Sequence, residues 1–437
     1  MLVQIKKYIP QRIKRVLWLL KLRTIEQWQK KLLFLCMKKK HQIFLSKIKG
    51  KKRIRVIFLT LHKSVWKVDI LFKKMQTDPF FEPIILVCPY TAQGEERMWS
   101  NMIECLDYFK KKQYRAYSSY NKEEKKWIKL SELEPDIVFF TNSNNLTLHE
   151  FYRNAFEGYL SCYVPYFSDI ATDYDTQSAY NQLFHNLIWK NFIDSNFSKD
   201  RAASVLANKG SNLVVTGSPL LEELLLHKKI NYNIWKLQDR PKKKIIYAPH
   251  QSIFEDDVIN LSTFLEAGEF IKDLSAKYKD KVQWSFKPHP LLKSKLYKHP
   301  KWGKLRTDQY YYYWSNQIFS QLDEGDYIDL FKTSDSIIHD CGSFVLEYLL
   351  TKNPCAFLEL NQKSQLSSIN SFGLEALKCY ERIHSLVDIE KFVVKIAESN
   401  APLNSDYMNF IKKYIDKLSK HENPSDLILQ NIKKELA

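Results

Sequence analysis

The sequence predicts an α/β protein made of two facing Rossmann-like domains, with a basic amphipathic helical arm in front of them. Three observations lead to this fold class. Strand-type apolar runs alternate with helix-type segments from residue 53 onward, a stretch around Pro241 interrupts the pattern as a linker would, and positive charge is concentrated near the start. We therefore expect the arm over 1–52, an N-terminal domain over 53–240 and a C-terminal domain over 241–437.

The expected strands are short apolar runs bounded by polar or turn residues. In the first domain they are 53–62, 82–90, 135–143, 161–169 and 212–219, the last of which closes the domain. The second domain restarts with a strand over 243–252, a helix over 262–278, a strand over 282–290, a strand, turn and helix within 334–354, and a strand over 355–360. Two C-terminal helices, within 388–398 and 405–435, are expected to pack back on the body.

The composition is that of a globular protein. Of the 437 residues, 45% are hydrophobic, 27% are charged and 14% are aromatic, which excludes a disordered chain. The seven cysteines are scattered, form no C-x-x-C pair and follow no signal peptide, so we expect a cytosolic protein with reduced thiols and no zinc site. No carboxylate pair is placed for another metal, and we expect none.

The arm carries nearly all of the net charge. Residues 1–55 contain 18 Lys or Arg and one acidic residue, a net charge of +17, whereas the whole chain carries +18. Apolar residues such as Ile5 and Ile9 recur at helical spacing, Trp18 and Trp28 add interfacial anchors, and no apolar run reaches the roughly 18–20 residues that span a bilayer. The arm fits amphipathic helices on an anionic membrane surface. The alternative is a basic helix packed on the body. No nucleic-acid partner is expected, because no nucleic-acid-binding motif accompanies the charge.

Three strands of the second half end in residues that could bind a ligand. In open parallel sheets, ligands bind beyond the carboxyl ends of the strands. The first of these strands is followed by His250, the second by Lys287 and His289 with two prolines in the loop, and the third by a turn that opens a helix. Taken alone, these residues have simpler explanations. His250 would be a turn histidine, and Lys287 and His289 would be ordinary loop residues. Their occurrence at three strand ends favours a phosphate-rich ligand.

The turn after the third strand is made of small and polar residues, including Asp340, Gly342 and Ser343. A strand-to-helix turn of this kind leaves backbone N–H groups at the helix N-terminus, where phosphate binds readily. Gly342 would let the backbone come close to the ligand and the Ser343 hydroxyl would add a hydrogen bond. Glu347, one turn into the helix, is placed to accept from ribose hydroxyls. For Asp340 or Ser343 alone, a helix N-cap is the competing explanation.

These same residues carry a family resemblance over about 240–360. The segment "IIYAPHQS" resembles the Tyr-Ala-Pro-Thr-Trp segment of the CDP-glycerol glycerophosphotransferase family, the teichoic-acid polymerases and their capsule-cluster relatives. "FKPHP" resembles that family's Arg-x-His-Pro loop, with Lys287 in the arginine place and His289 on the histidine. "SIIHDCGSFVLEY" resembles its Asp-Tyr-Ser-Ser turn, where Asp340 and Ser343 match and Glu347 replaces an aspartate. The resemblance implies a GT-B-like fold in which the C-terminal domain holds a CDP-alcohol.

One departure from the family concerns the catalytic base. The family's N-terminal domain usually offers a Trp-His-Gly motif whose histidine is the presumed base, and this chain has no such motif. The equivalent segment is "CYVPYFSDIATDYDTQSAYNQLFHNLIWKNF", which leaves Asp169, Asp173 and His185 as candidates. His250 is a further candidate base in the second half.

The resemblance implies a transferase on the cytoplasmic face of the cell membrane, peripherally attached. It would move glycerol phosphate or ribitol phosphate from CDP-glycerol or CDP-ribitol to a hydroxyl of a lipid-linked cell-surface glycan, as in capsule or teichoic-acid synthesis, and release CMP. No cofactor beyond that donor is expected. His289, Lys287, Ser343 and the helix N-terminus would neutralise the diphosphate.

Two other function classes stay open at this point. A GT-B glycosyltransferase that uses a nucleotide sugar is compatible with the same fold, because one fold hosts both chemistries. A non-catalytic membrane-surface scaffold, with the basic arm as its working part, is the second alternative.

Overall fold

A computed structural model gives the fold of the chain and describes residues 11–166, 170, 179–225, 230–255, 257, 259–360, 366–399, 403, 405–415 and 423–437. The chain divides into two compact units, each taken by itself below. The first comprises Met1–Tyr166, Asp175–Ser218 and Ser425–Ala437, and the second comprises Phe167–Tyr174 and Pro219–Pro424.

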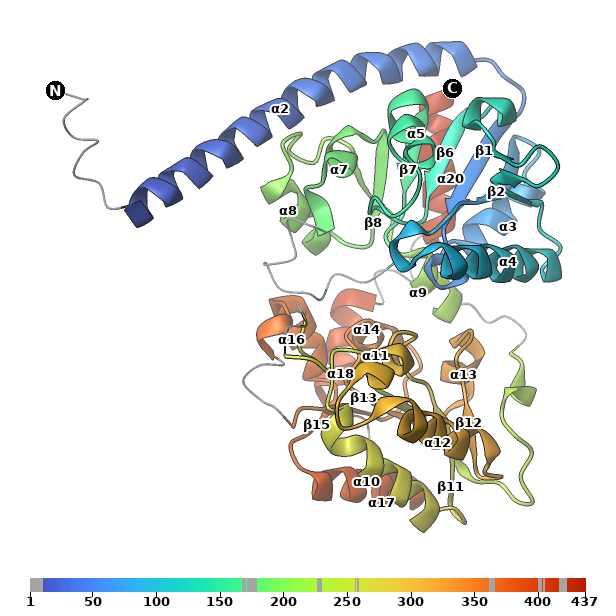
Figure 1. Cartoon of the computed structure of the whole chain (residues 1–437), viewed down its shortest axis with the longest axis vertical. Coiled ribbons are helices and arrows are strands. Elements are labelled where there is room, and N and C mark those ends of the chain that lie inside the picture. Colours follow the sequence, from blue (N-terminus) through green and yellow to red (C-terminus); the bar gives the residue numbers. More distant parts are fainter. Residues whose placement is uncertain are drawn as a thin grey trace. The chain divides into compact units, whose positions relative to one another are not determined.

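The first unit is built on a seven-stranded sheet in which every neighbouring pair is parallel (Figure 1). Its strands, in the order in which they lie side by side, are β3 (Ala116–Ser118), β2 (Phe81–Val87), β1 (Ile54–Thr60), β6 (Ile137–Phe140), β7 (Leu160–Tyr163), β8 (Lys190–Ile193) and β9 (Leu213–Val215). The chain runs from β1 outward to β3 and then returns to the other side of β1. This reversal between β1 and β6 makes a topological switch point.

Helices cover both faces of this sheet, which explains why its strands are continuous apolar runs. Val56 and Phe58 of β1 enter the core beneath α3, α4 and α20, whereas Ile57 and Leu59 enter the core beneath α2, α5 and α7, because successive strand residues point to opposite faces. The helices of the unit are α2 (Gln11–Ile48), α3 (Asp69–Thr77), α4 (Glu95–Lys111), α5 (Arg153–Gly158), α7 (Leu183–Leu187), α8 (Asn196–Val205) and α20 (Pro424–Leu436). A small antiparallel pair, β4 (Tyr120–Asn121) and β5 (Lys126–Trp127), follows β3 in the chain.

The C-terminal helix α20 belongs to the first unit, which differs from the predicted C-terminal domain over 241–437. Its apolar residues Ile428 and Ile432 are fully buried in the core of the first unit. Two ion pairs support the docking, Lys74 with Asp426 at 2.6 Å and Lys433 with Asp78 at 2.5 Å. Helical spacing in the sequence shows that α20 has an apolar face, but it does not identify the surface that covers it.

Helix α2 is the predicted basic arm, and its described side chains form two opposite apolar faces. The inner face packs on the first unit through buried and partly buried side chains, namely Lys30, Phe34, Met37, His41 and Ile48. The outer face consists of exposed apolar side chains, namely Ile25, Trp28, Leu32 and Leu35. With 3.6 residues per turn, the two sets lie on opposite sides of the helix. In the part of the chain that the structure describes, no helix is long and apolar enough to cross a membrane.

The second unit is built on a six-stranded sheet, again parallel throughout. Its strands lie in the order β12 (Ser320–Leu322), β11 (Val282–Phe286), β10 (Lys243–Ala248), β13 (Ser336–His339), β14 (Cys355–Leu358) and β15 (Glu381–Ile383). As in the first unit, the chain's first strand lies inside the sheet, and the chain order reverses beside it, here between β10 and β13. The predicted fold class, two parallel-sheet α/β domains, is confirmed.

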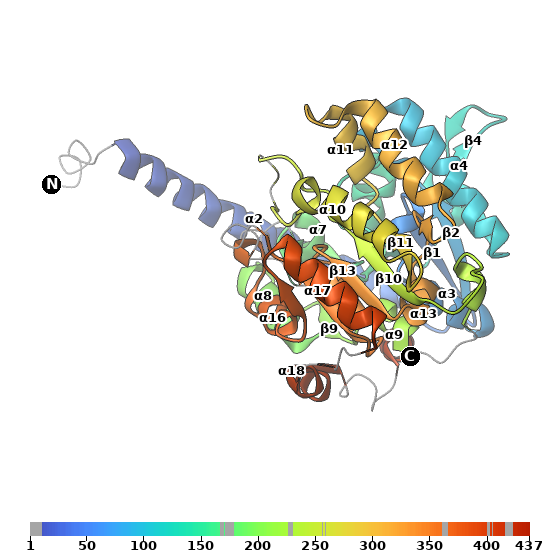
Figure 2. The same ribbon diagram turned by 90° about the horizontal axis from the view of Figure 1, so that it is seen from below.

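Two helical layers enclose this sheet. In Figure 2, α10 and α17 lie over the strands β10, β11 and β13, and with α12 they bury one face of the sheet. The other face is buried by α9, α13, α14, α16 and α18. The helices are α9 (Pro219–Leu225), α10 (Phe264–Lys277), α11 (Leu292–Lys298), α12 (Gly303–Asn316), α13 (Ile328–Thr333), α14 (Phe344–Leu349), α16 (Ser371–Leu377), α17 (Leu386–Ala397) and α18 (Ser405–Phe410), followed by a π-helical turn over Ile411–Ile415.

The second unit begins earlier in the chain than the predicted boundary at residue 241. Trp235 is buried in its core and donates a hydrogen bond of 2.8 Å from its indole N–H to Thr333 Oγ1. The stretch expected as a linker starts the sheet instead, since Lys243 and Lys244 are the first two residues of β10. Polar residues are common both in linkers and at the ends of strands. For this reason the composition of the stretch predicted the domain boundary at the wrong place.

Candidate functional site

The three strand ends predicted to bind a ligand meet at one edge of the second sheet. β11, β10 and β13 are neighbours, and the register aligns Ala248, the last residue of β10, with His339, the last residue of β13. The segments that follow these three strands carry His250, His289 and Asp340. The chain order reverses between β10 and β13, which is the place where open α/β sheets bind ligands. The structure therefore brings the predicted residues together at a switch point.

His250 and His289 form a pair of rings at this edge. Their ring centroids are 5.2 Å apart with an interplanar angle of 64°. The backbone N–H of His289 donates to the carbonyl of Pro249 at 3.0 Å, which ties the two loops together. Both histidines are partly buried. The geometry fixes two imidazoles next to each other on neighbouring strands.

The contacts of Ser252 determine which nitrogen of His250 carries the proton. Ser252 Oγ accepts hydrogen bonds from the backbone N–H groups of Leu261 at 3.0 Å and Ser262 at 3.1 Å. Its own proton is therefore directed to His250 Nδ1, which lies 2.8 Å away. Nδ1 also accepts from the backbone N–H of Ser252 at 3.3 Å. The neutral ring then carries its proton on Nε2, so His250 is a hydrogen-bond donor at that atom.

His289 has the same tautomer for a similar reason. The backbone N–H of Leu291 donates to His289 Nδ1 at 3.2 Å, which leaves the proton of the neutral ring on Nε2. Burial and the nearby charges of Lys295 and Lys287 lower the pKa of His289 to about 4. Burial, with His289 and Lys295 nearby, also lowers the pKa of His250, so both rings are neutral at physiological pH. The candidate base His250 is thus arranged as a donor, and the pair offers two N–H groups to an anion.

Two lysines surround the pair. Lys295 of α11 forms an ion pair with Asp257, whose other carboxylate oxygen accepts from the backbone N–H of Phe254 at 3.0 Å. Lys287 is 7% exposed, and its ammonium donates to the carbonyls of Asp323 at 3.2 Å and Gly325 at 2.9 Å. Lys287 therefore holds the loop after β12, while its charge acts on the histidines from nearby.

Asp340 is buried completely and anchors the loop that follows β10. One carboxylate oxygen accepts from the backbone N–H of His250 at 2.5 Å, and the other accepts from the backbone N–H and the hydroxyl of Thr263 at 2.6 and 2.8 Å. Burial raises the pKa of this carboxyl to about 6, although the three hydrogen bonds oppose the rise. The structure thus places Asp340 under the loop, where its carboxylate fixes the backbone of His250 and Thr263.

The turn after β13 has a different geometry from the one predicted. Helix α14 has only six residues, and the N–H groups of Phe344 and Val345 already donate to the carbonyls of Cys341 and Gly342, at 3.2 Å each. Gly342 is close-packed, because a Cβ there would lie 3.2 Å from the side chains of Ile170 and of Leu261. The glycine therefore serves close apolar packing. Of the turn's predicted groups, the Ser343 hydroxyl is the one that is exposed.

Glu347 is 1% exposed and lies beside Tyr327. Burial first, and then the charge and hydrogen bond of Glu347, raise the pKa of the Tyr327 hydroxyl above its usual range. Lys287 lies over the same ring, with its nitrogen 5.5 Å from the ring centroid. Glu347 is thus a buried partner of Tyr327 in this structure and is not exposed at the surface.

Of the candidate bases predicted in the first half, the structure describes His185, and it does not lie at an exposed site. His185 lies on α7 with 0% exposure, packed against the rings of Tyr163 at 5.9 Å and Phe184 at 5.3 Å between centroids. Neither ring nitrogen of His185 has a hydrogen-bond partner among the described residues. A base must reach a substrate hydroxyl, so this burial removes His185 from the candidates. Asp169 and Asp173 lie outside the described residues.

The burial of His185 predicts an effect of pH on stability. Burial, and secondarily the charge of Lys30, lower its pKa to about 3 from an ordinary value of 6.5. Between those values the unfolded chain binds a proton that the folded chain does not, so stability falls as the pH drops below 6.5, by roughly 1.4 kcal/mol per pH unit. We expect the melting temperature of His185→Leu to be close to that of wild type at pH 7. Between pH 7 and pH 5 the melting temperature of the variant should fall by less than that of wild type. His149→Leu, an exposed position on the same unit, should follow wild type. If the melting temperatures of His185→Leu and wild type changed in parallel with pH, the burial of a neutral His185 would be contradicted.

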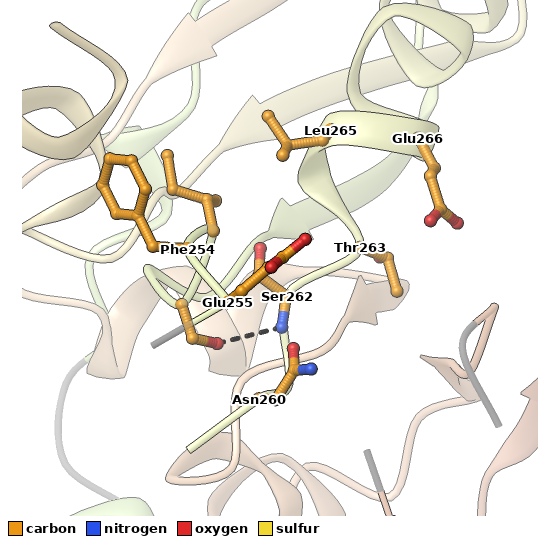
Figure 3. A pocket seen from close by; sticks show the side chains of 9 residues that line it. Phe254, Glu255, Asn260, Ser262, Thr263, Leu265 and Glu266 are labelled. Atoms are coloured by element: carbon orange, nitrogen blue, oxygen red, sulfur yellow. Dashed lines mark hydrogen bonds between the residues drawn. The ribbon is translucent and has the colours of Figure 1, made fainter. Parts of the chain in front are cut away.

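A hollow of about 170 Å³ lies next to the histidine pair, in the loop between β10 and α10 (Figure 3). It is lined by Ser252, Ile253, Phe254, Glu255, Asn260, Ser262, Thr263, Leu265 and Glu266. Its two carboxylates, Glu255 and Glu266, repel phosphate and suit hydroxyl groups. Among the described residues, no three His, Cys, Asp or Glu side chains come together to hold a metal ion. The two carboxylates make this hollow a less suitable place for a phosphate than the histidine pair.

Comparison with known proteins gives no match in sequence but several in three-dimensional structure. No protein-family model and no curated protein matches the sequence. The UDP-GlcNAc 2-epimerase from Neisseria meningitidis, bound to UDP-GlcNAc, is 14% identical, with 87% of this chain and 100% of the epimerase covered and a TM-score of 0.51. Two variants of the wall teichoic acid polymerase TagF are 15% and 14% identical, with 94% of this chain and 99% and 100% of theirs covered and TM-scores of 0.57 and 0.53.

The chain has a GT-B-like fold. The likeness to teichoic-acid polymerases that the second half predicts is thus found again in the three-dimensional structure, although at these identities it concerns the fold. Epimerases and polymerases share this fold with the chain, so the fold alone does not choose between their reactions. That choice depends on the residues at the edge of each sheet.

Proposed function

We propose that the protein transfers a polyol phosphate, glycerol phosphate or ribitol phosphate, from a CDP-activated donor to a hydroxyl of a lipid-linked glycan. The observation that carries this proposal is the His250–His289 pair, whose rings lie 5.2 Å apart at the switch point of the second sheet, each with its Nδ1 occupied by hydrogen-bond donors. Two neutral N–H donors with Lys295 and Lys287 nearby suit a diphosphate, whose charge increases on the leaving CMP as the bond breaks. The TagF structures support the choice of donor, because one of them was soaked with CDPG and has a TM-score of 0.51.

The reaction requires three changes of bonding. The acceptor hydroxyl loses its proton to a base, its oxygen forms a bond to the β-phosphorus of the donor, and the bond from that phosphorus to CMP breaks. The tautomers of His250 and His289 suit the last of these changes, since an N–H donor stabilises the departing phosphate oxygen. They do not supply the base, because their Nδ1 atoms are occupied by N–H and O–H donors.

A GT-B enzyme that uses a nucleotide sugar is the second candidate. One observation favours it, namely that the structural neighbour from Neisseria meningitidis is bound to UDP-GlcNAc. Both donors present a diphosphate to the protein, so the histidine pair serves either one. The nucleobase and the transferred group distinguish the two candidates.

The donor is tested by thermal shift and calorimetry on the full chain with CDP-glycerol, CDP-ribitol, CMP and UDP- or GDP-sugars. We expect the CDP-polyols to raise the melting temperature more than any UDP- or GDP-sugar at equal concentration. A larger shift with a nucleotide sugar would replace the proposed donor by the second candidate. A chain that no nucleotide stabilises would support a non-catalytic scaffold.

The outer face of α2 supports attachment to an anionic membrane surface, where a lipid-linked acceptor would be found. Its exposed apolar side chains are flanked by exposed lysines on both sides, namely Lys31 and Lys38 on one and Lys40 and Lys47 on the other. Apolar residues with lysines beside them are typical of helices that lie in the membrane interface. At about 1 kcal/mol per lysine near such a surface, four lysines strengthen attachment by roughly a thousandfold.

Replacing Trp28, Leu32 and Leu35 by serine should weaken binding to liposomes that contain phosphatidylglycerol by at least tenfold, because each removed apolar side chain contributes about 1.5–3 kcal/mol when buried. Cosedimentation measures the effect. A matched control replaces three exposed apolar residues of the second unit by serine, Leu237, Leu305 and Ile318, which are 94%, 74% and 75% exposed. High salt should release much of the wild-type protein. If both triple variants cosediment with the liposomes to the same extent, the proposed membrane role of α2 is wrong.

A further inference from the structure

The first unit repeats the histidine arrangement of the second. In both sheets the chain's first strand lies beside the switch point, β1 in the first unit and β10 in the second. His62 follows the last residue of β1 by two positions, as His250 follows the last residue of β10. A serine comes two positions after each histidine, Ser64 and Ser252. The sequences "LHKS" and "PHQS" thus occupy equivalent places.

The side-chain geometry is repeated as well. Ser64 Oγ lies 2.5 Å from His62 Nδ1, as Ser252 Oγ lies 2.8 Å from the Nδ1 of the second unit's histidine. The ring of Tyr90 lies 5.4 Å from the ring of His62 at 57°, close to the 5.2 Å and 64° of the His250–His289 pair. Tyr90 follows the end of β2 by three residues, as His289 follows the end of β11.

The segments that carry these residues are fixed at the switch point of the first sheet. The backbone N–H of Cys88, after β2, donates to the carbonyl of Thr60 at 2.8 Å. The hydroxyl of Thr141, after β6, donates to the carbonyl of Leu59 at 2.9 Å. The carboxyl ends of β1, β2 and β6 are therefore tied together directly beneath His62, which is partly buried.

One difference separates the two histidines. Ser252 Oγ accepts from two backbone N–H groups and must donate to its histidine, whereas Ser64 is exposed and accepts from no backbone N–H of the described residues. Ser64 Oγ is thus able to accept a hydrogen bond from a protonated Nδ1 of His62, which leaves a lone pair on Nε2 of the neutral ring. Burial, with Arg97 nearby, lowers the pKa of His62 to about 4, so the ring is neutral in the free protein.

The surroundings of His62 indicate the ligand class. Lys63 and Arg97 both pair with the carboxylate of Glu104, at 3.7 and 3.6 Å, so two cationic side chains lie close to His62 in the chain or in space. A tyrosine ring beside a histidine suits the hydroxyl-bearing face of a polyol or sugar. Together these groups fit a molecule that carries both a free hydroxyl and a phosphate.

We propose that His62, Ser64 and Tyr90 form a second ligand site, which binds the acceptor as a hydroxyl-bearing phosphate ester, and that Nε2 of His62 accepts the proton of that hydroxyl. The acceptor role rests on the proposed function. In the deprotonation step the O–H bond breaks, its proton moves to Nε2, and the electron pair of that bond stays on the oxygen, which becomes the nucleophile of the transfer. His62 thus takes the place of the base that the family's missing motif would supply.

The binding test uses the full chain, labelled with 15N at the histidine ring nitrogens, with sn-glycerol 3-phosphate as the probe. The signal of His62, assigned by its loss in His62→Gln, should report a proton on Nδ1, whereas those of His250 and His289 should report a proton on Nε2. Glycerol 3-phosphate should shift the His62 signal, and Ser64→Ala should change its tautomer. If the chemical shift of His62 does not change when glycerol 3-phosphate is added, the proposed site is overturned.

The functional test separates this inference from the proposed function. His62→Gln should lower transfer from CDP-glycerol by roughly 10²–10⁴-fold, because glutamine donates a hydrogen bond but does not take up the proton. CMP binding should stay within about twofold of wild type. His149→Gln, on the same unit, is the control with unchanged transfer. Normal transfer by His62→Gln overturns the base role and leaves the donor assignment intact. If wild type transfers nothing from any CDP-polyol, the proposed function and the acceptor role both fail, and a shift of His62 by the probe still supports the ligand site.

Discussion

His289→Ala is expected to lower the rate of transfer by roughly 10²–10⁴-fold while the protein keeps its fold. The side chain of His289 is at the edge of the sheet and adds one bond to its loop, which Nδ1 accepts from the backbone N–H of Leu291 at 3.2 Å. Two backbone bonds also hold the loop: the N–H of His289 donates to the carbonyl of Pro249, and its carbonyl accepts from the N–H of Leu292. Alanine preserves both of those bonds. The loss should therefore appear in kcat and in CDP-polyol affinity, measured by steady-state kinetics and calorimetry, with little change in melting temperature.

The glutamine variant distinguishes a donor from a base at this position. His289→Gln places an N–H group near the site of Nε2 and should recover a large part of the activity that alanine loses, because the role proposed for His289 is donation of a hydrogen bond. His250→Gln should behave in the same way. Lys298→Ala, an exposed position on α11 in the same unit, is the matched control. If glutamine is as inactive as alanine at both histidines, proton transfer replaces hydrogen-bond donation as their role. A melting temperature that collapses along with activity would make His289 a structural residue.

Asp340→Ala is expected to destabilise the second unit by roughly 3 kcal/mol or more and to abolish donor binding. The substitution leaves the buried N–H groups of His250 and Thr263 without their acceptor, and each unsatisfied buried donor costs about 1–3 kcal/mol. The loop that orients His250 loses its anchor at the same time. Thermal unfolding monitored by fluorescence measures the first effect, and calorimetry with CDP-glycerol measures the second.

Asp340→Asn should be nearly as damaging, because one of its two side-chain atoms becomes an NH₂ group that faces N–H donors. Thr263→Val removes only the hydroxyl bond of 2.8 Å and should cost less than either change. Asp308→Ala, whose carboxylate lies on the surface of α12 in the same unit, is the control. An Asp340→Ala protein that melts like wild type but fails to bind donor would show direct contact between Asp340 and the ligand, and the buried placement would then be wrong for the bound state.

Local sequence patterns predicted the main elements of both units. Continuous apolar runs such as 53–62 and 282–290 are found as β1 and β11, because strands buried on both faces need apolar residues at every position. The short strands β3, β8, β12 and β15 were missed. Each has only three or four residues, and such lengths are too brief for a periodic signal.

The candidate site was predicted in part, since parallel strands bring their carboxyl ends together whatever helices connect them. That rule gathered His250, His289 and Asp340 from positions far apart in the chain. It did not tell which of them faces a ligand and which lies beneath the site. Lys295 was not predicted at all, because its place beside the histidines depends on how α11 packs.

By itself the sequence determined the fold class, the basic arm and the edge of the sheet at which ligand groups collect. These follow from the order of residues, because apolar periodicity and strand ends are local properties. Burial was decided by the tertiary structure alone. It enclosed His185 in a core, placed Asp340 under a loop, docked α20 on the first unit and set His62 beside Tyr90. Each of these outcomes depends on which surface covers a side chain, and that surface comes from residues distant in the sequence.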